Sequence, residues 1–364
     1  MQAALRGAAR QTVQLSTART RRNGNWPGSW KSLAIVFMIA LCSALFAAEP
    51  EGIVLVGAGS SVPLPLYRKW ADLYNQTNKT VQLQYLAMGN VEGIAQITHG
   101  VSDFGAGELP LSAEERRQGS LTELPVVLIG IVPIYNLPGN PQLRLSGEVL
   151  AEIYLGRIKN WNDPAIRKLN PNVTLPSMPI HVVYRPAGKG SNYVFTEFLS
   201  KTSVAFRDQL GRSASPKWPV GESAERSSDM ADKVKNNSGA LGFVELQYAD
   251  DNGIMHASVL NGAGKFIKAT ADSISAACVA VEAPTWEKLA ASLTNAPGAD
   301  SYPISSFTWL YVRPSARDAH RTAAMVRFLN WAYEDGQDVA VHEGYSKLPK
   351  QLVVKVLAKV NSMQ

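Results

Sequence analysis

Three segments of the chain share one pattern, in which an apolar run leads into a polar turn with glycine and then into a stretch with helical spacing. They lie near residues 57–63, 105–112 and 185–192. A helix start presents unpaired N–H groups and the positive end of the helix dipole, so each junction suits an anion. The first offers Ser60 and Ser61, and the third offers Arg185, Lys189 and Ser191. Taken singly, each also fits a simple helix-capping turn.

The alternation of strand-like and helix-like segments continues along the chain, which is typical of a mixed α/β protein. We expect strands at 52–56, 81–85, 101–106, 125–135, 180–184, 240–244 and 302–312. We expect helices from residue 63, after the turn at 185–192, and over 90–99, 146–154 and 322–340. Val91, Ile94 and Ile97 should share the buried face of one helix, and Ser146 should cap another.

The first 48 residues have the composition of an export signal. Residues 33–48 read LAIVFMIALCSALFAA, an apolar run that follows Lys31 and ends in small residues. Six of the 36 basic residues and none of the 30 acidic residues precede Glu49, so the remainder is electrically balanced. This predicts a signal peptide with an extended basic n-region over 1–48, and it argues against nucleic-acid binding. The alternative is an uncleaved membrane anchor, although the run is shorter than the roughly 20 residues that span a bilayer.

Patterns for enzymatic chemistry are absent from the sequence. Val62 stands where a dinucleotide fingerprint would need its third glycine, and Lys189 is followed by glycine, unlike the lysine of a phosphate-loop NTPase. The five histidines show no metal-ligand spacing, and no Gly-x-Ser-x-Gly motif occurs. Cys278, the single cysteine after the predicted signal, lies among apolar residues and should be a buried free thiol. We therefore expect a chain that is not an enzyme and needs no cofactor or metal.

Several longer stretches together carry more information than these local patterns. In chain order they are GAGSSVPLPLYRKWADLY, VSDFGAGELPLS, LSGEVLAEIYLGRIKNWNDPAIRKLNP, VVYRPAGKGSNYVFTEFLS, WPVG, SGALGFVELQYA and YPISSFTWLYV. In sequence and in order they resemble the periplasmic phosphate-binding proteins of phosphate-specific ABC importers. The resemblance covers nearly the whole mature chain, and the stretch at 145–171 is its most specific part. The three junctions coincide with that family's ligand-contacting segments.

The resemblance implies an α/β, two-lobed type II periplasmic binding protein with a two-strand hinge and a ligand cleft between the lobes. Lobe I would comprise 49–130 and 300–364, and lobe II would comprise 131–299. The chain would cross between the lobes near 125–136 and again near 297–312. Its partners would be inorganic phosphate or a related oxyanion and an inner-membrane ABC permease. The mature protein would be a periplasmic monomer that does not bind nucleic acid.

The resemblance also assigns candidate ligand-binding residues. By position these are Ser61, Val62, Asn90, Glu108, Arg185, Lys189, Gly190 and Ser191. Val62 would contribute its backbone N–H group. In the family a carboxylate accepts a proton from phosphate and thereby rejects fully ionised sulfate, and Glu108 stands where the family has that residue as Asp.

Four positions depart from the family pattern. Asn90 and Lys189 each replace a Ser, Glu108 replaces an Asp, and Ala187 replaces an Asp that pairs with the arginine. Added positive charge favours an oxyanion but weakens discrimination by geometry. An ion pair between Lys189 and Glu108 would close the site. Three functions therefore stay open: a phosphate receptor, the same receptor retuned to a phosphorylated or carboxylated small molecule, and a ligand-free secreted interaction scaffold.

Overall fold

A computed structural model describes residues 52–281, 292–314 and 318–363. The predicted signal peptide at 1–48, with Cys42, lies outside the described residues. The strands up to residue 145 are β1 (Ile53–Gly59), β2 (Val81–Ala87), β3 (Phe104–Gly107), β4 (Thr122–Tyr135) and β5 (Arg144–Leu145). Those that follow are β6 (His181–Tyr184), β7 (Glu222–Ser223), β8 (Ala240–Glu245), β9 (Met255–His256), β10 (Ser258–Leu260), β11 (Phe266–Ile267) and β12 (Ser305–Val312).

The helices alternate with these strands. Up to residue 202 they are α2 (Leu64–Thr77), α3 (Asn90–Thr98), α4 (Ala113–Gly119), α5 (Gly147–Tyr154), α6 (Pro164–Leu169) and α7 (Gly190–Thr202). Further on are α8 (Val204–Gln209), α9 (Ser227–Asn236), α10 (Leu246–Asp251), α11 (Ala271–Val279), α13 (Ala319–Tyr333), α14 (Asp335–His342) and α15 (Lys350–Asn361). Among the described residues, no helix is both long enough and apolar enough to cross a membrane.

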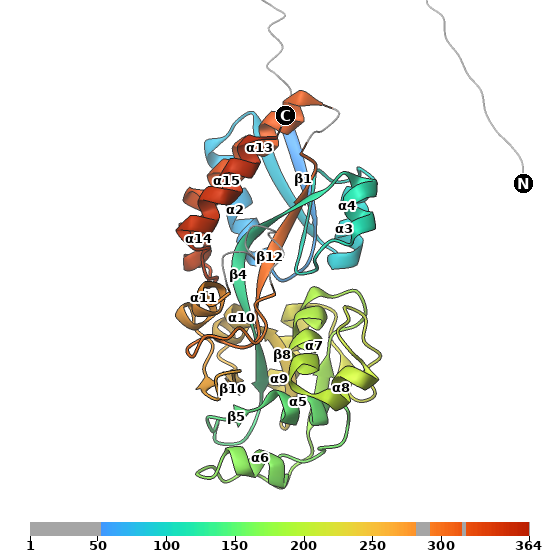
Figure 1. Ribbon diagram of the computed structural model, residues 1–364, viewed down its shortest axis with the longest axis vertical. Coiled ribbons are helices and arrows are strands. Elements are labelled where there is room, and N and C mark those ends of the chain that lie inside the picture. Colours follow the sequence, from blue (N-terminus) through green and yellow to red (C-terminus); the bar gives the residue numbers. More distant parts are fainter. Residues whose placement is uncertain (1–51, 282–291, 315–317, 364) are drawn as a thin grey trace, which may run out of the picture. The chain divides into compact units, whose positions relative to one another are not determined.

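The main sheet has the strand order β2-β1-β3-β12-β4-β8-β6-β7, with β9 also paired to β4. Figure 1 shows the long strand β4 beside β12. Strand β4 pairs with different strands along its length. Residues 122–130 of β4 pair with β12, whereas residues 131–135 pair with β8. We call the part around β2, β1, β3 and β12 half-sheet A, and the part around β8, β6 and β7 half-sheet B. The change of partner follows Gly130, the last residue of the first predicted segment of lobe I. The lobe boundaries themselves remain a prediction.

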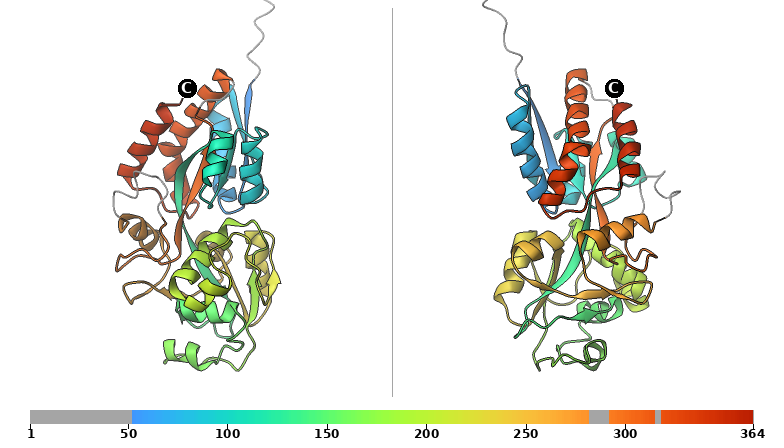
Figure 2. Two further views of the ribbon diagram at one scale, coloured as in Figure 1. Left: turned by 45° about the vertical axis from the view of Figure 1, so that its right-hand side comes forward. Right: turned by 90° about the vertical axis from the view of Figure 1, so that its left-hand side faces the viewer.

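Helices pack against both half-sheets. Helices α2, α3 and α13 contact the strands of half-sheet A, and α7 and α9 contact β8 and β4 in half-sheet B. Figure 2 shows half-sheet A with helices on either side. In half-sheet A, β1 is parallel to β2 and β3, and in half-sheet B, β6 is parallel to β7 and β8. The carboxyl ends of these parallel strands are where ligands bind in open α/β sheets.

The apolar core is continuous through both half-sheets. Around half-sheet A, the Trp70 indole Nε1 donates to the Gly336 carbonyl at 2.9 Å. Around half-sheet B, the rings of Phe195 and Phe243 stack with their centroids 4.2 Å apart. Cys278 is a fully buried free thiol, as predicted, and burial raises its pKa to about 12. Ser146 caps α5 by accepting a hydrogen bond from the Val149 N–H group, also as predicted.

Three local predictions were wrong. The expected glycine turn at 57–59 belongs to β1, because these glycines allow close packing: a Cβ on residue 57 would lie 2.0 Å from the Phe104 ring. Val91 is exposed, since the buried face of α3 contains Asn90 and Gly93 beside the two isoleucines. The helix expected over 322–340 is broken at Glu334 into α13 and α14, and Gly336 just beyond the break packs on the Trp70 ring.

Candidate anion-binding site

The N-termini of α2, α3, α7 and α9 meet where the parallel strands end. Ser61 precedes α2, and its hydroxyl lies 3.5 Å from that of Ser227, the first residue of α9. A Cβ on Gly190, the first residue of α7, would lie 2.1 Å from the side-chain amide nitrogen of Asn90, the first residue of α3. Helices from both half-sheets therefore direct their positive ends toward one region.

Glu108, immediately after β3, is the buried carboxylate of this region. Its Oε2 accepts hydrogen bonds from the Ser60 hydroxyl at 2.8 Å and the Asn90 Nδ2 at 2.7 Å. Asn90 also accepts from the Glu108 backbone N–H at 2.9 Å, which fixes both residues. The other oxygen, Oε1, is buried without a hydrogen-bond partner among the described residues. Burial raises the pKa of Glu108 to about 8, although the hydrogen bonds from Ser60 and Asn90 oppose the shift.

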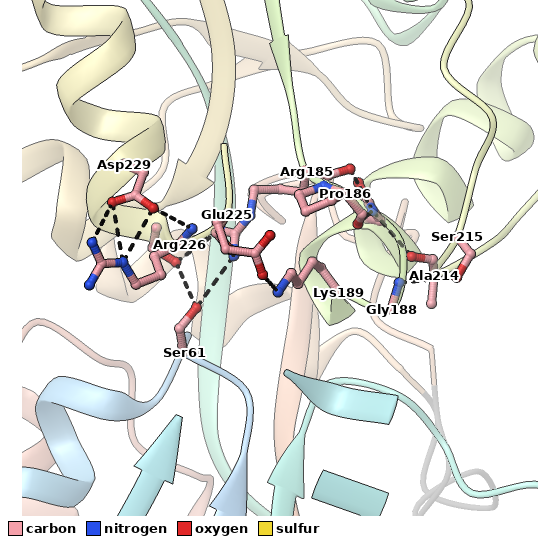
Figure 3. Close-up of polar contacts among 12 residues, drawn as sticks. Ser61, Arg185, Pro186, Gly188, Lys189, Ala214, Ser215, Glu225, Arg226 and Asp229 are labelled. Carbon is pink, nitrogen blue, oxygen red and sulfur yellow. Dashed lines mark hydrogen bonds and ion pairs between the residues drawn. The ribbon is translucent and has the colours of Figure 1, made fainter. Parts of the chain in front are cut away.

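Arg185 supplies a buried guanidinium immediately after β6. Its Nη1 donates to the Ser227 hydroxyl at 3.1 Å, and its Nη2 donates to the Glu225 carbonyl at 2.9 Å and, at 3.4 Å, to the Ser61 hydroxyl (Figure 3). The side chain is 1% exposed, and its Nε has no hydrogen-bond partner within the described part of the chain. Burial lowers the pKa of Arg185, and the Glu245 carboxylate is the strongest influence against this shift. The guanidinium thus joins residues of both half-sheets.

The turn between β6 and α7 is held by an amide side chain. Asn192 Nδ2 donates to the carbonyls of Arg185 at 3.0 Å, Pro186 at 2.7 Å and Ala214 at 3.1 Å. This places the N-terminus of α7 against Asn90 and Glu108, where residue 190 has no room for a side chain. The Ser191 hydroxyl, next along α7, is buried and has no partner among the described residues.

Val62 and Lys189, like the site residues above, also have partners within the chain. The Val62 N–H donates to the Ser60 hydroxyl at 3.1 Å, and the Tyr345 hydroxyl donates to the Val62 carbonyl at 2.8 Å. Lys189 forms an ion pair with Glu225. The notion that Lys189 pairs with Glu108 is therefore wrong, because Glu108 instead accepts from Ser60 and Asn90.

Glu245 is a further buried carboxylate at the same sheet edge. The register of β6 against β8 pairs His181 with Ala240 and Val182 with Leu241, so Arg185 and Glu245 both follow at the carboxyl ends of adjacent parallel strands. Glu245 is fully buried. Burial raises its pKa, and the Arg185 charge and the Ser227 hydroxyl oppose that rise. Glu245 can thus act as a counter-charge to Arg185 where Ala187 offers none.

All eight predicted residues lie in this region. The sequence reasoning missed Ser227, Glu225 and Glu245, and it noted the Ser60 hydroxyl without including it in the site. One signal was available for Glu245, since an acidic residue that ends a buried apolar strand points to a counter-charge. Ser227 and Glu225 had none, because only the fold brings them to Arg185. Among the described residues, no group of three His, Cys, Asp or Glu side chains could hold a metal ion.

This fold, with helix starts facing one another across a sheet edge, is that of a two-lobed type II periplasmic binding protein. A family model described as a PBP superfamily domain matches residues 43–335. The phosphate-binding protein PstS of Pasteurella multocida is 36% identical over 325 residues, which cover 88% of this chain and 94% of that protein. PstS of Haemophilus influenzae is 37% identical over 303 residues, or 82% of this chain and 90% of the relative. The chain therefore belongs to the PBP superfamily and, within it, to the PstS family of phosphate-binding proteins.

Solved structures agree on the fold. A high-affinity periplasmic phosphate-binding protein, PfluDING, bound with phosphate, superimposes with a TM-score of 0.69 at 20% identity, covering 84% of this chain and 93% of that chain. A putative phosphate ABC transporter substrate-binding protein with bound phosphate from Clostridium perfringens gives 0.59 at 21% identity, covering 81% and 100%. The curated relatives are named as binding proteins, which agrees with the prediction that this chain is not an enzyme.

Proposed function

We propose that this chain is a periplasmic receptor that captures inorganic phosphate and delivers it to an inner-membrane ABC permease. The observation that carries the proposal is a buried arginine beside polar groups that have no partner in the described part of the chain, at a point where several helices begin. Arg185 Nε, Ser191 Oγ and Glu108 Oε1 are all buried without a hydrogen-bond partner among the described residues. Buried polar groups are usually satisfied, so this arrangement fits a ligand that both donates and accepts.

We propose that the ligand is bound by Ser61, Val62, Asn90, Glu108, Arg185, Gly190 and Ser191. Arg185 and the N–H groups at the start of α7 donate to phosphate oxygens, as guanidinium groups and helix N-termini do. The free Oε1 of Glu108 accepts the proton of hydrogen phosphate. Lys189 borders these groups, and its contribution is argued separately below.

Retuning to a different anion is the second candidate. It is favoured by the longer carboxylate at position 108 and by the ammonium group of Lys189 beside the start of α3. Export to the periplasm and a monomeric state complete the proposal. They can be checked by sequencing the N-terminus of protein recovered from the periplasm and by light scattering of the purified chain.

Isothermal titration of anion-stripped mature protein tests the proposal, with phosphate, sulfate and a phosphomonoester titrated in parallel. At pH 9, where Glu108 is mostly ionised, we expect micromolar or tighter binding of phosphate and much weaker binding of sulfate. Heat only from the phosphomonoester would favour the retuned receptor. Silence with all three anions would contradict both candidates.

A further inference from the structure

The segment 225–227 contacts both basic side chains that border the site. The Glu225 carbonyl and the Ser227 hydroxyl accept from Arg185 at 2.9 and 3.1 Å. The Glu225 carboxylate pairs with the Lys189 ammonium (Figure 3). One short segment therefore restrains both cations, although by different means: it gives Arg185 only neutral acceptors, whereas its carboxylate compensates the charge of Lys189.

The Lys189 ammonium is held at the edge of the site. Its side chain is 13% exposed, whereas that of Glu225 is 65% exposed. A Cβ on Gly89, just before α3, would lie 3.7 Å from Lys189 Nζ. The ammonium thus lies between Glu225 and the start of α3. It is beside Gly89, and the next residue is the Asn90 that donates to Glu108. Freed from Glu225, a side chain of this length and flexibility can reach toward an anion at the helix starts.

An unpaired Lys189 ammonium would change the selectivity of the site between anions. Glu108 distinguishes anions by whether they carry a proton, whereas a lysine is a point charge with little geometric preference that attracts any anion. Sulfate gains from such a charge but cannot satisfy an ionised Glu108. Pairing Lys189 with Glu225 therefore preserves selection by hydrogen bonding.

We propose that Glu225 is a specificity-determining residue, which keeps the Lys189 ammonium paired and out of contact with the bound anion. The inference rests on the proposed function, because it presupposes that an oxyanion binds beside Arg185. It adds a residue that does not touch the ligand and that acts through Lys189.

The test compares phosphate and sulfate affinities of the full mature protein with those of Glu225→Gln. Because the Glu225 side chain is mostly exposed, the variant should fold like the wild type. We expect sulfate affinity to rise about fivefold or more and phosphate affinity to rise less, because phosphate already satisfies Glu108, so the preference for phosphate over sulfate falls. Glu222→Gln is the matched control, since it removes an exposed carboxylate from an ion pair with Lys233 in the same region and should leave the preference unchanged.

A Lys189→Ser background shows whether the effect passes through Lys189. There, adding Glu225→Gln should no longer change the preference, because the ammonium that it would free is gone. An unchanged preference in Glu225→Gln alone, or an equal fall in the Lys189→Ser background, would overturn the inference and leave the proposed function intact. Absence of phosphate binding by the wild type would instead refute the proposed function, and this inference with it.

Discussion

The protonation state of Glu108 links selectivity to pH at the level of single residues. Ser60 and Asn90 both donate to Oε2, so a proton on Glu108 can occupy only Oε1, the atom without a partner among the described residues. Hydrogen phosphate brings its own proton and can bind an ionised Glu108. Sulfate brings none and needs Glu108 to carry one, which the pKa of about 8 permits at neutral pH.

We therefore predict that rejection of sulfate becomes stricter as pH rises. Above pH 8 the protonated fraction of Glu108 falls about tenfold per unit, and sulfate affinity should fall with it. Phosphate affinity should change much less between pH 7 and 9. Competition titrations at several pH values measure both affinities, and Glu108→Gln should remove the pH dependence of sulfate binding. A sulfate affinity independent of pH in the wild type would show that Glu108 does not exchange this proton.

A second prediction for single residues concerns Glu245, the counter-charge of Arg185. Glu245 and Arg185 are both buried at the ends of adjacent strands, so Glu245→Gln leaves a buried guanidinium with less compensation. We expect the free energy of unfolding of the ligand-free protein to fall by about 3 kcal/mol. Saturating phosphate should recover part of this loss, because the anion supplies negative charge.

Urea unfolding with and without phosphate measures both effects of Glu245→Gln, and Glu222→Gln serves as an exposed carboxylate control. If Glu245→Gln unfolds at the same urea concentration as the wild type, Glu245 is not the counter-charge of Arg185.

At the level of helices and strands, the site depends on how closely α7 approaches α3. Gly190→Ala would place a Cβ 2.1 Å from both Asn90 Nδ2 and Glu108 Oε2. The start of α7 must then move away, and we expect phosphate affinity to fall about tenfold or more, since small displacements in a preorganised site are costly. Gly52→Ala is the control because its Cβ would meet nothing closer than 3.7 Å. Titration calorimetry measures the phosphate affinity of both variants. An unaltered affinity in Gly190→Ala would mean that phosphate binding does not need the close approach of α7 to α3.

The helices and strands also show how much of the fold could be predicted from the sequence. The strand, turn and helix order was recoverable because apolar periodicity is local, and Ser146 could be assigned as a cap for the same reason. The roles of Gly57 and Gly59 could not be predicted. A glycine in a turn and a glycine that admits a close neighbour have the same local sequence. Only the packing of the Phe104 ring against Gly57 and of the Ala106 backbone against Gly59 separates them. The segment after the break at Glu334 likewise has a distant partner, since Trp70 donates to the Gly336 carbonyl from more than 250 residues away.

The candidate site shows the same division. Resemblance to a known family supplied residues at the starts of α2, α3 and α7 and directly after β3 and β6, whereas Glu225, Ser227 and Glu245 come from other segments. Those residues reach Arg185 only through the parallel pairing of β6 with β8 and the position of α9. Apart from the acidic end of β8, long-range charge compensation of this kind leaves no signal in the sequence.

For the molecule as a whole, β4 couples the two half-sheets. This strand pairs with β12 over its first part and with β8 over its last, and one core cluster extends through both half-sheets. Since neither half-sheet has a separate core among the described residues, this part of the chain should unfold in one cooperative transition even without ligand. Phosphate at 100 times its Kd should then stabilise the entire unit by about 2.7 kcal/mol.

Scanning calorimetry, read beside circular dichroism and tryptophan fluorescence, tests this coupling. The probes should give coincident transitions that move together to higher temperature as phosphate is added. Two separate transitions in the absence of phosphate, of which the anion shifts only one, would show that the half-sheets unfold independently. Binding energy would then be confined to one half-sheet, whereas the contacts of Arg185 with both Ser61 and Ser227 require that it stabilise the two together.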